Sequence, residues 1–281
     1  MHPFIIGLGG DSGSGKGTIG RLLLDVFDEK NLLTISMDAY HKWNRYEMRK
    51  QTLTHLNPKA NNLRLAEDHL KDLKEGKTIK KVIYDHSTGL FTPPAAVSPK
   101  KLIIITGLHP YHRKLMRRLF DLKLFISPDE DVRKKWKVHR DMSKRGYKNK
   151  KSVLKILSQR KPDSFGYIHA QEQYADLLLK YFEIGDTDNT KEMELGLSLI
   201  FKKRPKYSLQ IIKKSLQNKT LRAMLEGKAL TLTGTVSKKQ IEALAAILIP
   251  KSELLKKSPT WHSGMKGIIQ LICTLEVLNR L

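Results

Sequence analysis

The sequence is poor in cysteine, in acidic residues and in long apolar runs. Cys273 is the single cysteine among 281 residues, so no intramolecular disulfide can form and no cysteine cluster can bind a metal. No apolar stretch approaches the roughly 20 residues that a helix needs to cross a bilayer. The N-terminal MHPFIIGLGGD lacks the basic flank and the cleavage pattern of a signal peptide. We therefore expect a cytoplasmic protein with no membrane span.

Acidic residues are scarce: the chain has 28 Asp and Glu but 52 Lys and Arg, and its formal net charge is therefore +24. This charge has two interpretations. The lysines and arginines form a solvated surface, or they attract anionic ligands such as nucleotides, sugar phosphates or RNA. A dense basic run covers 133–151, where Asp141 is the single acid. Recognition of single-stranded RNA usually adds exposed stacking aromatics, and Trp136 and Tyr147 are too few for that. We therefore expect no nucleic-acid partner.

Short apolar runs alternate with stretches of helical periodicity through the first two thirds of the chain. The runs that predict strands are 3–9, 32–37, 101–106 and 121–127. The stretches that predict helices are 18–30, 63–77, 128–146, 152–160 and 170–182. Strands that alternate with helices favour an α/β fold with a doubly wound, mostly parallel sheet, in which ligands bind beyond the carboxyl ends of the strands.

The pattern changes beyond about residue 188. A polar break at 185–192 precedes strand-like runs at 193–201 and 228–235, and helical stretches follow from Lys238 and near the C-terminus. We therefore predict one large unit over 1–188 and a small α+β extension over 189–281.

A glycine-rich turn follows the first predicted strand. Residues 10–16 read GDSGSGK and match GxxxxGK, the P-loop pattern, in which backbone N–H groups converge on phosphate oxygens and the lysine reaches the β- and γ-phosphates. An ordinary glycine turn is the alternative, but the strand before it and the amphipathic helix after it favour ATP binding and a P-loop NTPase-type fold. The expected ATP-binding residues are Gly10, Asp11, Ser12, Gly13, Ser14, Gly15, Lys16, Gly17 and Thr18.

Seven segments resemble, in the same order, those of the phosphoribulokinases within the uridine kinase superfamily. They are GDSGSGKGT (10–18), SMDAYHKWNRYEMR (36–49), LNPKANNLRL (56–65), IYDHSTGLFTPP (83–94), TGLHP (106–110), HRDMSKRG (139–146) and RKPDSFGYI…QYAD (160–176). The resemblance covers about residues 10–180. It implies a kinase domain over 1–188 that uses ATP to convert ribulose 5-phosphate into ribulose 1,5-bisphosphate. Since HRDMSKRG is shared with uridine kinases, a uridine or nucleoside kinase stays as the alternative.

Phosphoryl transfer to a hydroxyl needs a carboxylate near that hydroxyl and cations around the transferred group. Asp38 follows the strand 32–37, which we expect to adjoin the P-loop strand, so Asp38 is the candidate base and metal ligand. Its alternative role is a cap of a turn or helix. The resemblance assigns His41 and Arg45 to substrate binding, and an arginine suits bidentate contact with a phosphate.

Two faces of the predicted helix 128–146 carry different side chains. One face carries, at i, i+4 and i+8, Lys137, Asp141 and Arg145. The face that we expect to be more buried carries Val132, Trp136 and His139. By spacing alone the first face is a solvated ladder of ion pairs. The resemblance instead makes Lys16 and Lys137 catalytic residues beside Asp38, and implies substrate binding by Arg140, Asp141 and Arg145.

Two positions depart from the phosphoribulokinase pattern at the metal site. Gly17 stands where the P-loop has Ser or Thr to bind Mg²⁺, and Thr106 stands where the family has the glutamate of EGLHP. ATP and Mg²⁺ remain the expected cofactors, with Asp38 as the clear metal carboxylate. A nucleotide-binding pseudokinase with a weakened Mg²⁺ site is therefore a further alternative.

Ser14 replaces the P-loop cysteine of the photosynthetic enzymes, so no disulfide switch is expected. The resemblance also implies a homodimer.

Overall fold

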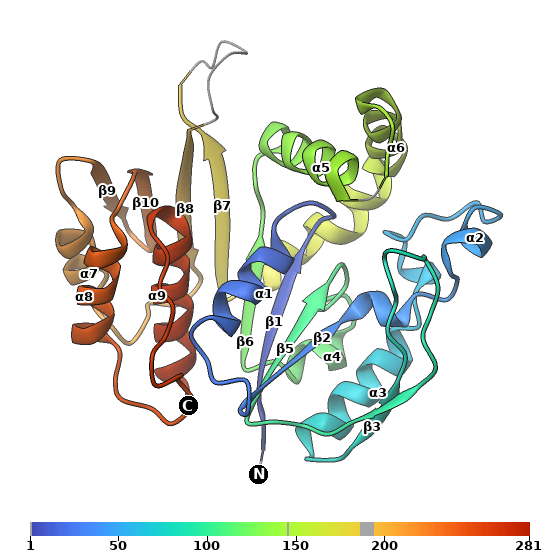
Figure 1. The fold of residues 1–281 in the computed structure, drawn as a ribbon, viewed down its shortest axis with the longest axis horizontal. Helices are drawn as coiled ribbons and strands as arrows, with labels where there is room; N and C mark the ends of the chain where they lie inside the picture. The colour runs from blue at the N-terminus through green and yellow to red at the C-terminus, as the bar shows by residue number, and fades with distance from the viewer. Residues whose placement is uncertain (1, 145, 186–193) are drawn as a thin grey trace.

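The computed structural model describes residues 2–144, 146–185 and 194–281, and it contains an eight-stranded sheet with helices on both faces (Figure 1). From edge to edge the strands are β2 (Leu32–Ser36), β5 (Leu102–Gly107), β1 (Phe4–Gly10), β6 (Leu122–Ile126), β7 (Leu177–Glu183), β8 (Leu195–Phe201), β10 (Ala229–Gly234) and β9 (Leu221–Glu226). The strands from β2 to β7 are parallel, and β8, β10 and β9 continue the sheet antiparallel. The predicted α/β class with a mostly parallel sheet is confirmed.

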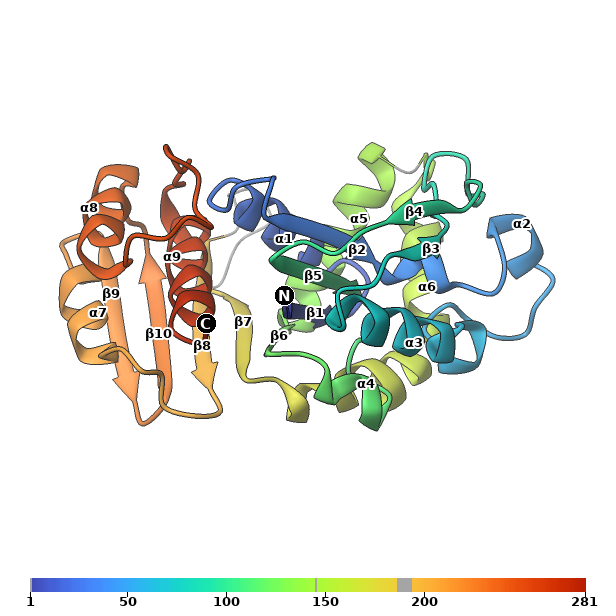
Figure 2. The same cartoon turned by 90° about the horizontal axis from the view of Figure 1, so that it is seen from below.

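Helices cover both faces of this sheet (Figure 2). One face is covered by α1 (Lys16–Leu24), α7 (Leu209–Leu216), α8 (Lys238–Leu248) and α9 (Gly264–Leu278). The other face is covered by α3 (Leu63–Lys74) and α4 (Lys114–Arg118). Two helices lie beyond the carboxyl end of β1, and they are α5 (Glu130–Lys144) and α6 (Lys150–Asp163). Shorter elements are η1 (Met37–Tyr40), α2 (Arg45–Met48), η2 (Pro58–Ala60), β3 (Ile79–Lys81), β4 (Ala95–Val97), η3 (Ser164–Ile168) and η4 (His169–Tyr174).

The side chains of β1 divide the core into two halves. Phe4, Ile6 and Leu8 point to the face that α1 covers, and Ile5 points to the other face. Every residue of β1 is buried, as expected for a parallel strand that lies between two others and is covered on both faces. Each large aliphatic side chain buried in this way contributes roughly 1.5–3 kcal/mol. This packing fixes the end of β1 and therefore the start of the glycine-rich loop.

Two predictions about the sheet are wrong. The stretch 170–182, predicted as a helix, forms η4 and then β7, because 177–183 pairs with β6 on one side and β8 on the other. The strand before Asp38 does not adjoin the P-loop strand, because β5 lies between β2 and β1. The short helix α7 and the strand β9 were not expected from the sequence.

Residues 195–281 extend the same sheet, since β8 pairs with β7 over its whole length. The fully buried Gln270 of α9 donates hydrogen bonds to the carbonyl oxygens of Leu22 and Thr260, each at 3.0 Å, and so ties α9 to α1. The predicted boundary at 188/189 lies outside the described residues, and the two-unit division stays a prediction. Within the described residues, no helix is both long and apolar enough to cross a bilayer.

Candidate active site

The candidate site lies at the carboxyl ends of the parallel strands. The glycine-rich loop leads from β1 into α1, and Asp38 lies in η1 directly after β2. Lys16 and Asp38 lie close enough for the charge of each to shift the pKa of the other. The two most important predicted residues are therefore brought together, although β5 separates their strands.

The glycine-rich loop packs closely against α5. Gly13 has φ +88°, and a Cβ added there would lie 2.8 Å from the Cβ of Lys137, so only glycine fits. Lys16 Nζ donates to the carbonyl oxygens of Gly10 and Asp11, both at 2.7 Å. Burial lowers the pKa of Lys16 to about 8, against the attraction of Asp11 and Asp38. The ammonium group thus lies across the loop, where phosphate oxygens of a nucleotide could replace these carbonyl oxygens as its hydrogen-bond acceptors.

Asp38 lies beside His86, His41 and Lys16. Its Oδ2 lies 2.9 Å from His86 Nε2, and its Oδ1 lies 3.7 Å from His41 Nε2. Burial raises the pKa of Asp38, but the hydrogen bond to His86 and the charges of His41 and Lys16 outweigh it and lower the pKa below its usual range. Asp38 is therefore ionised at neutral pH, as a base or a metal ligand must be.

Arg45 holds the segment that carries His86. Its guanidinium donates to the carbonyl oxygens of His86 at 2.5 Å and Ser87 at 3.4 Å, and its backbone N–H donates to Gly89 at 2.9 Å. The predicted substrate residue Arg45 is thus already bound to backbone carbonyls beside Asp38. His41 is 8% exposed, and its ring lies 4.2 Å from the ring of His55, centroid to centroid.

The charged face of α5 is the buried one, which corrects the prediction that His139 would be buried. Lys137 and Asp141 are each 2% exposed, and Lys137 Nζ lies 2.7 Å from Asp141 Oδ2. Arg140 Nε donates to Asp141 Oδ1 at 2.9 Å. His139 is exposed, because α5 turns its ionic face toward the glycine-rich loop. Arg145 lies outside the described residues.

The sequence did not single out Arg160, a partly buried residue near the end of α6. Its guanidinium makes no hydrogen bond or ion pair with any residue in the described part of the chain. Burial lowers the pKa of His41, His55 and Lys137, and the charge of Arg160 contributes to each shift. Arg160 therefore faces the same site as these residues. Its segment, 160–176, is one of those that resemble the phosphoribulokinases, and this was the available signal.

The donor set suits a metal that is bound mainly by phosphates. Asp38 is ionised, and Thr106 lies at the end of β5, in register with Ser36 of β2. A Cβ at Gly17 would meet nothing within 4 Å. Over the described ranges, no three His, Cys, Asp or Glu side chains are grouped so that they could hold a metal ion by themselves. Mg²⁺ is commonly bound through one or two carboxylates together with substrate phosphates, so a site built on Asp38 fits.

Comparison with known proteins agrees with the resemblance seen in the sequence. The sequence model of the phosphoribulokinase / uridine kinase family matches residues 5–188. Phosphoribulokinase of Synechocystis sp. is 37% identical over 203 residues, which cover 72% of this chain and 61% of that protein. Chloroplastic phosphoribulokinase of Arabidopsis thaliana is 35% identical over 225 residues, which cover 74% of this chain and 57% of that protein. The chain thus spans less than two thirds of the length of these relatives.

Uridine kinases and a solved structure complete the comparison. The uridine kinase of Brevibacillus brevis is 33% identical over 183 residues, which cover 63% of this chain and 85% of that protein. The structure of phosphoribulokinase from Rhodobacter spheroides superposes with a TM-score of 0.69 over 99% of this chain and 98% of that chain, at 20% identity. At this identity the superposition supports the fold.

Proposed function

The chain belongs to the phosphoribulokinase / uridine kinase family, and we propose that it transfers the γ-phosphate of ATP to a hydroxyl of ribulose 5-phosphate. The observation that carries the proposal is the ionised Asp38 beside Lys16 of the glycine-rich loop, with Arg160 left without a partner among the described residues. A carboxylate next to cations is what phosphoryl transfer to a hydroxyl requires.

In the proposed reaction, Asp38 accepts the proton of the attacking hydroxyl. The hydroxyl oxygen forms a bond to the γ-phosphorus as the bond from that phosphorus to the β–γ bridging oxygen breaks, so that ADP leaves. Lys16 and the loop amides hold the β- and γ-phosphates, and Lys137 offsets negative charge on the transferred group. Mg²⁺ held by Asp38 and the phosphates would neutralise charge on the nucleotide. Positioning and electrostatics supply most of the acceleration.

An anionic acceptor is favoured over uridine by the charge of the site. Lys137 and Arg140 share one carboxylate, Asp141, and Arg160 makes no ion pair with a described residue. A partly buried guanidinium without a partner is costly unless a ligand supplies the negative charge. We assign the phosphate of ribulose 5-phosphate to Arg160 and Arg140, and its hydroxyl groups to His41 and Asp141. Arg45 and Arg145 stay predicted substrate-binding residues.

Three activities can be separated in one experiment. ADP release is coupled to NADH oxidation with ribulose 5-phosphate, with uridine, and with no acceptor, each in Mg²⁺ and in Mn²⁺. We expect release that depends on ribulose 5-phosphate. Release that depends on uridine would make the protein a nucleoside kinase. No acceptor-dependent release in either metal, together with measurable ATP binding, would make it a pseudokinase.

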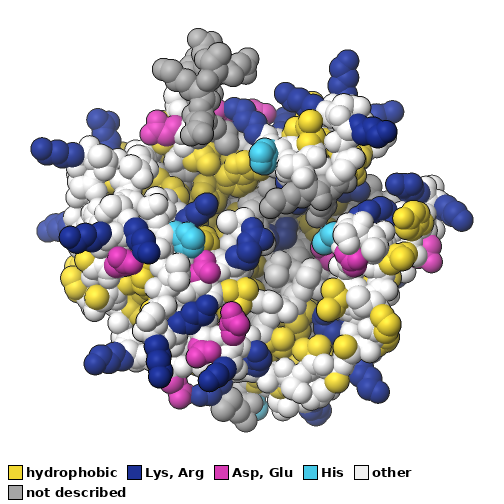
Figure 3. Space-filling view, in the orientation of Figure 1, with side chains coloured by type: hydrophobic (Ala, Val, Ile, Leu, Met, Phe, Trp, Pro, Cys, Tyr) yellow, Lys and Arg dark blue, Asp and Glu magenta, His cyan; other side chains and the backbone are white. Residues whose placement is uncertain are grey.

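Nucleic-acid binding, dimerisation and cellular location are the remaining questions. Lys and Arg side chains are scattered over the face seen in Figure 3 and do not form one patch there, which favours a solvated surface over a nucleic-acid site on that face. A homodimer and a cytoplasmic location stay predictions. Sedimentation equilibrium of the purified chain tests the first, and fractionation of cells that express the chain tests the second.

A further inference from the structure

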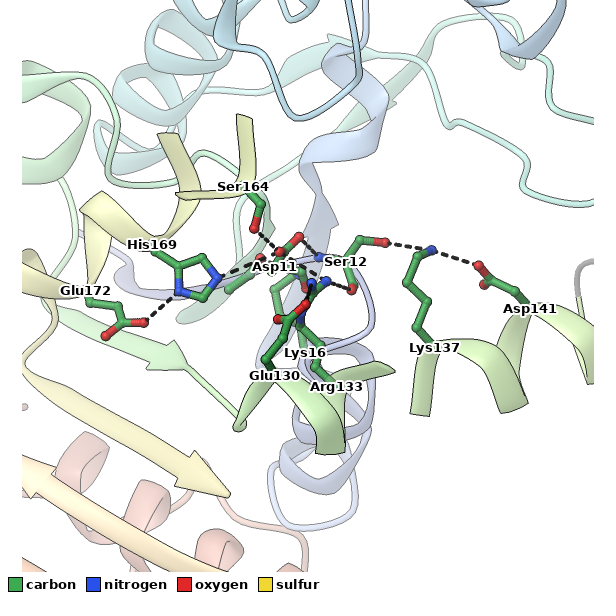
Figure 4. A network of polar contacts seen from close by, with 11 residues as sticks. Asp11, Ser12, Lys16, Glu130, Arg133, Lys137, Asp141, Ser164, His169 and Glu172 are labelled. Atoms are coloured by element: carbon green, nitrogen blue, oxygen red, sulfur yellow. Dashed lines mark hydrogen bonds and ion pairs between the residues drawn. The ribbon is translucent and has the colours of Figure 1, made fainter. Parts of the chain in front are cut away.

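The carboxylate of Asp11 is the centre of a buried polar network behind the glycine-rich loop (Figure 4). Its Oδ1 accepts a hydrogen bond from the backbone N–H of Ser12 at 2.5 Å. Its Oδ2 lies 3.1 Å from Arg133 Nη1 and 3.8 Å from His169 Nε2, and it accepts a hydrogen bond from Ser164 Oγ. Asp11 is 2% exposed. One side chain therefore joins the loop to α5, to η3 and to η4.

Arg133 binds the loop at a second point. It donates to the carbonyl oxygen of Ser12 at 3.2 Å and forms a two-pronged pair with Glu130, at 2.8 and 2.9 Å. Its side chain is 5% exposed. Removing one member of a buried ion pair leaves an uncompensated charge, which is strongly unfavourable. The loop is thus held to α5 through both its carboxylate and its backbone.

His169 supplies the second positive charge. Its Nδ1 lies 3.3 Å from Glu172 Oε1, and its ring stacks on Phe165 with 4.9 Å between centroids. The contacts with Asp11 and Glu172 raise the pKa of His169 to about 9, against the effect of burial. His169 is therefore a cation at neutral pH. The other charges around this network are Lys16 from α1, Glu130 and Arg133 from α5, Arg160 from α6 and Lys180 from β7.

We propose that Asp11 is a positioning residue whose carboxylate, held between Arg133 and His169, keeps the glycine-rich loop in the shape that binds the phosphates of ATP. The carboxylate faces these cations from behind the loop, while the Asp11 carbonyl accepts the hydrogen bond from Lys16 Nζ. The acid thereby orients the loop without contacting the nucleotide. Arg133 and His169, which also contact Glu130 and Glu172, both attract this carboxylate away from the phosphate side of the loop. The inference rests on the proposed function, because it concerns the same ATP site.

Two variants test the inference in the 281-residue chain. Asp11→Asn removes the charge and keeps the shape, and His169→Gln removes one of the two cations. We expect each to raise the Kd for ATP, measured calorimetrically with Mg²⁺, by about tenfold, since hydrogen bonds to charged groups are worth roughly that factor. The KM for ribulose 5-phosphate should change less than about twofold, the limit usual for a substitution away from the acceptor. Asp131→Asn and His139→Gln, on exposed positions of α5, are the matched controls.

The pH dependence distinguishes positioning from general loss of structure. Above pH about 9 the wild type also loses the charge of His169, so the ratio of Kd values between His169→Gln and wild type should fall toward one. Lys16 titrates in both proteins, so the ratio of the two Kd values, rather than either Kd alone, reports the charge of His169. If Asp11→Asn does not fold, His169→Gln decides the result, because His169 is partly exposed. Unchanged ATP affinity in His169→Gln, or a ratio that does not vary with pH, overturns the inference. Wild-type protein that binds no ATP refutes the proposed function instead.

Discussion

His86 Nε2 lies 2.9 Å from Asp38 Oδ2, although 48 residues separate the two in the sequence. Arg45 holds the backbone of His86 in place through the His86 carbonyl oxygen. One oxygen of Asp38 is therefore engaged, and the other, Oδ1, has among the side chains of the described residues only the more distant His41 at 3.7 Å. We infer that Oδ1 is the atom that accepts the proton from the acceptor hydroxyl.

Replacing Asp38 with asparagine tests this assignment. Asp38→Asn keeps the shape but removes the base, and we expect kcat to fall by about 1,000-fold, within the range that positioned general bases supply. The Kd for ATP should stay within about threefold, because the loop and Lys16 still bind the phosphates. Single-turnover kinetics and calorimetry give the two values. Asp68→Asn, on an exposed turn of α3, is the control. Near-normal turnover of Asp38→Asn would show that another group is the base.

A substitution of Arg160 is the second test, since a residue that binds the acceptor phosphate matters for a phosphorylated acceptor and not for a nucleoside. Arg160→Gln should raise the KM for ribulose 5-phosphate by about 10- to 100-fold, the effect of losing a charge-assisted hydrogen bond to a phosphate. The Kd for ATP should not change. The matched control is Lys155→Gln, which removes an exposed cation from the same helix. Equal KM values in the two variants would place the acceptor phosphate elsewhere.

Local patterns in the sequence predicted the part of the site that local structure builds. The apolar strand, the glycine-rich loop and α1 are adjacent in sequence, and their spacing alone indicated a phosphate site at Lys16. Asp38 was singled out because it directly follows a strand, although that strand adjoins β5 and not the P-loop strand. The family model and the superposition then confirmed the resemblance and the fold.

Contacts between distant residues could not be read in the same way. Arg133 binds the carbonyl oxygen of Ser12 across 121 positions, and Ser164 binds Asp11 across 153. No spacing rule links such pairs. The stretch 170–182 was misjudged because its leucines fit a helical period, whereas pairing with β6 and β8 makes 177–183 a strand. Likewise, the insertion of β5 between β2 and β1 is a property of the whole sheet.

Activity should fall on the alkaline side because of two lysines of the site, the partly buried Lys16 and the buried Lys137. Burial lowers the pKa of both Lys16 and Lys137 to about 8, while nearby carboxylates oppose the shift. Both are cations below that pH and lose their protons above it. We expect kcat/KM to decrease as the pH rises from about 8 to 10. The stability contribution of each lysine has the opposite sign, since between about 8 and 10.5 the unfolded state binds more protons, and the free energy of unfolding rises with pH.

The variant Lys137→Arg separates the two lysines, because a guanidinium stays charged throughout this range. The pH profile of kcat should become flatter, because Lys137 acts on the transferred group, while the profile of the Kd for ATP, which follows Lys16, should stay as in wild type. The profiles are recorded by initial rates and calorimetry in constant-ionic-strength buffers. A wild-type kcat/KM that is constant up to pH 10 would contradict the prediction.

The last test restores the hydroxyl that the P-loop lacks. A Cβ at Gly17 would meet nothing within 4 Å, and Gly17 lies in the first turn of α1, where the hydroxyl of a standard P-loop binds Mg²⁺. Gly17→Ser should therefore lower the Mg²⁺ concentration for half-maximal rate by about threefold to tenfold, in line with one added oxygen ligand. Gly17→Ala is the matched control, because it adds the same Cβ and a gain of up to about 1 kcal/mol in helix propensity. If both variants show the same Mg²⁺ dependence, position 17 does not face the metal.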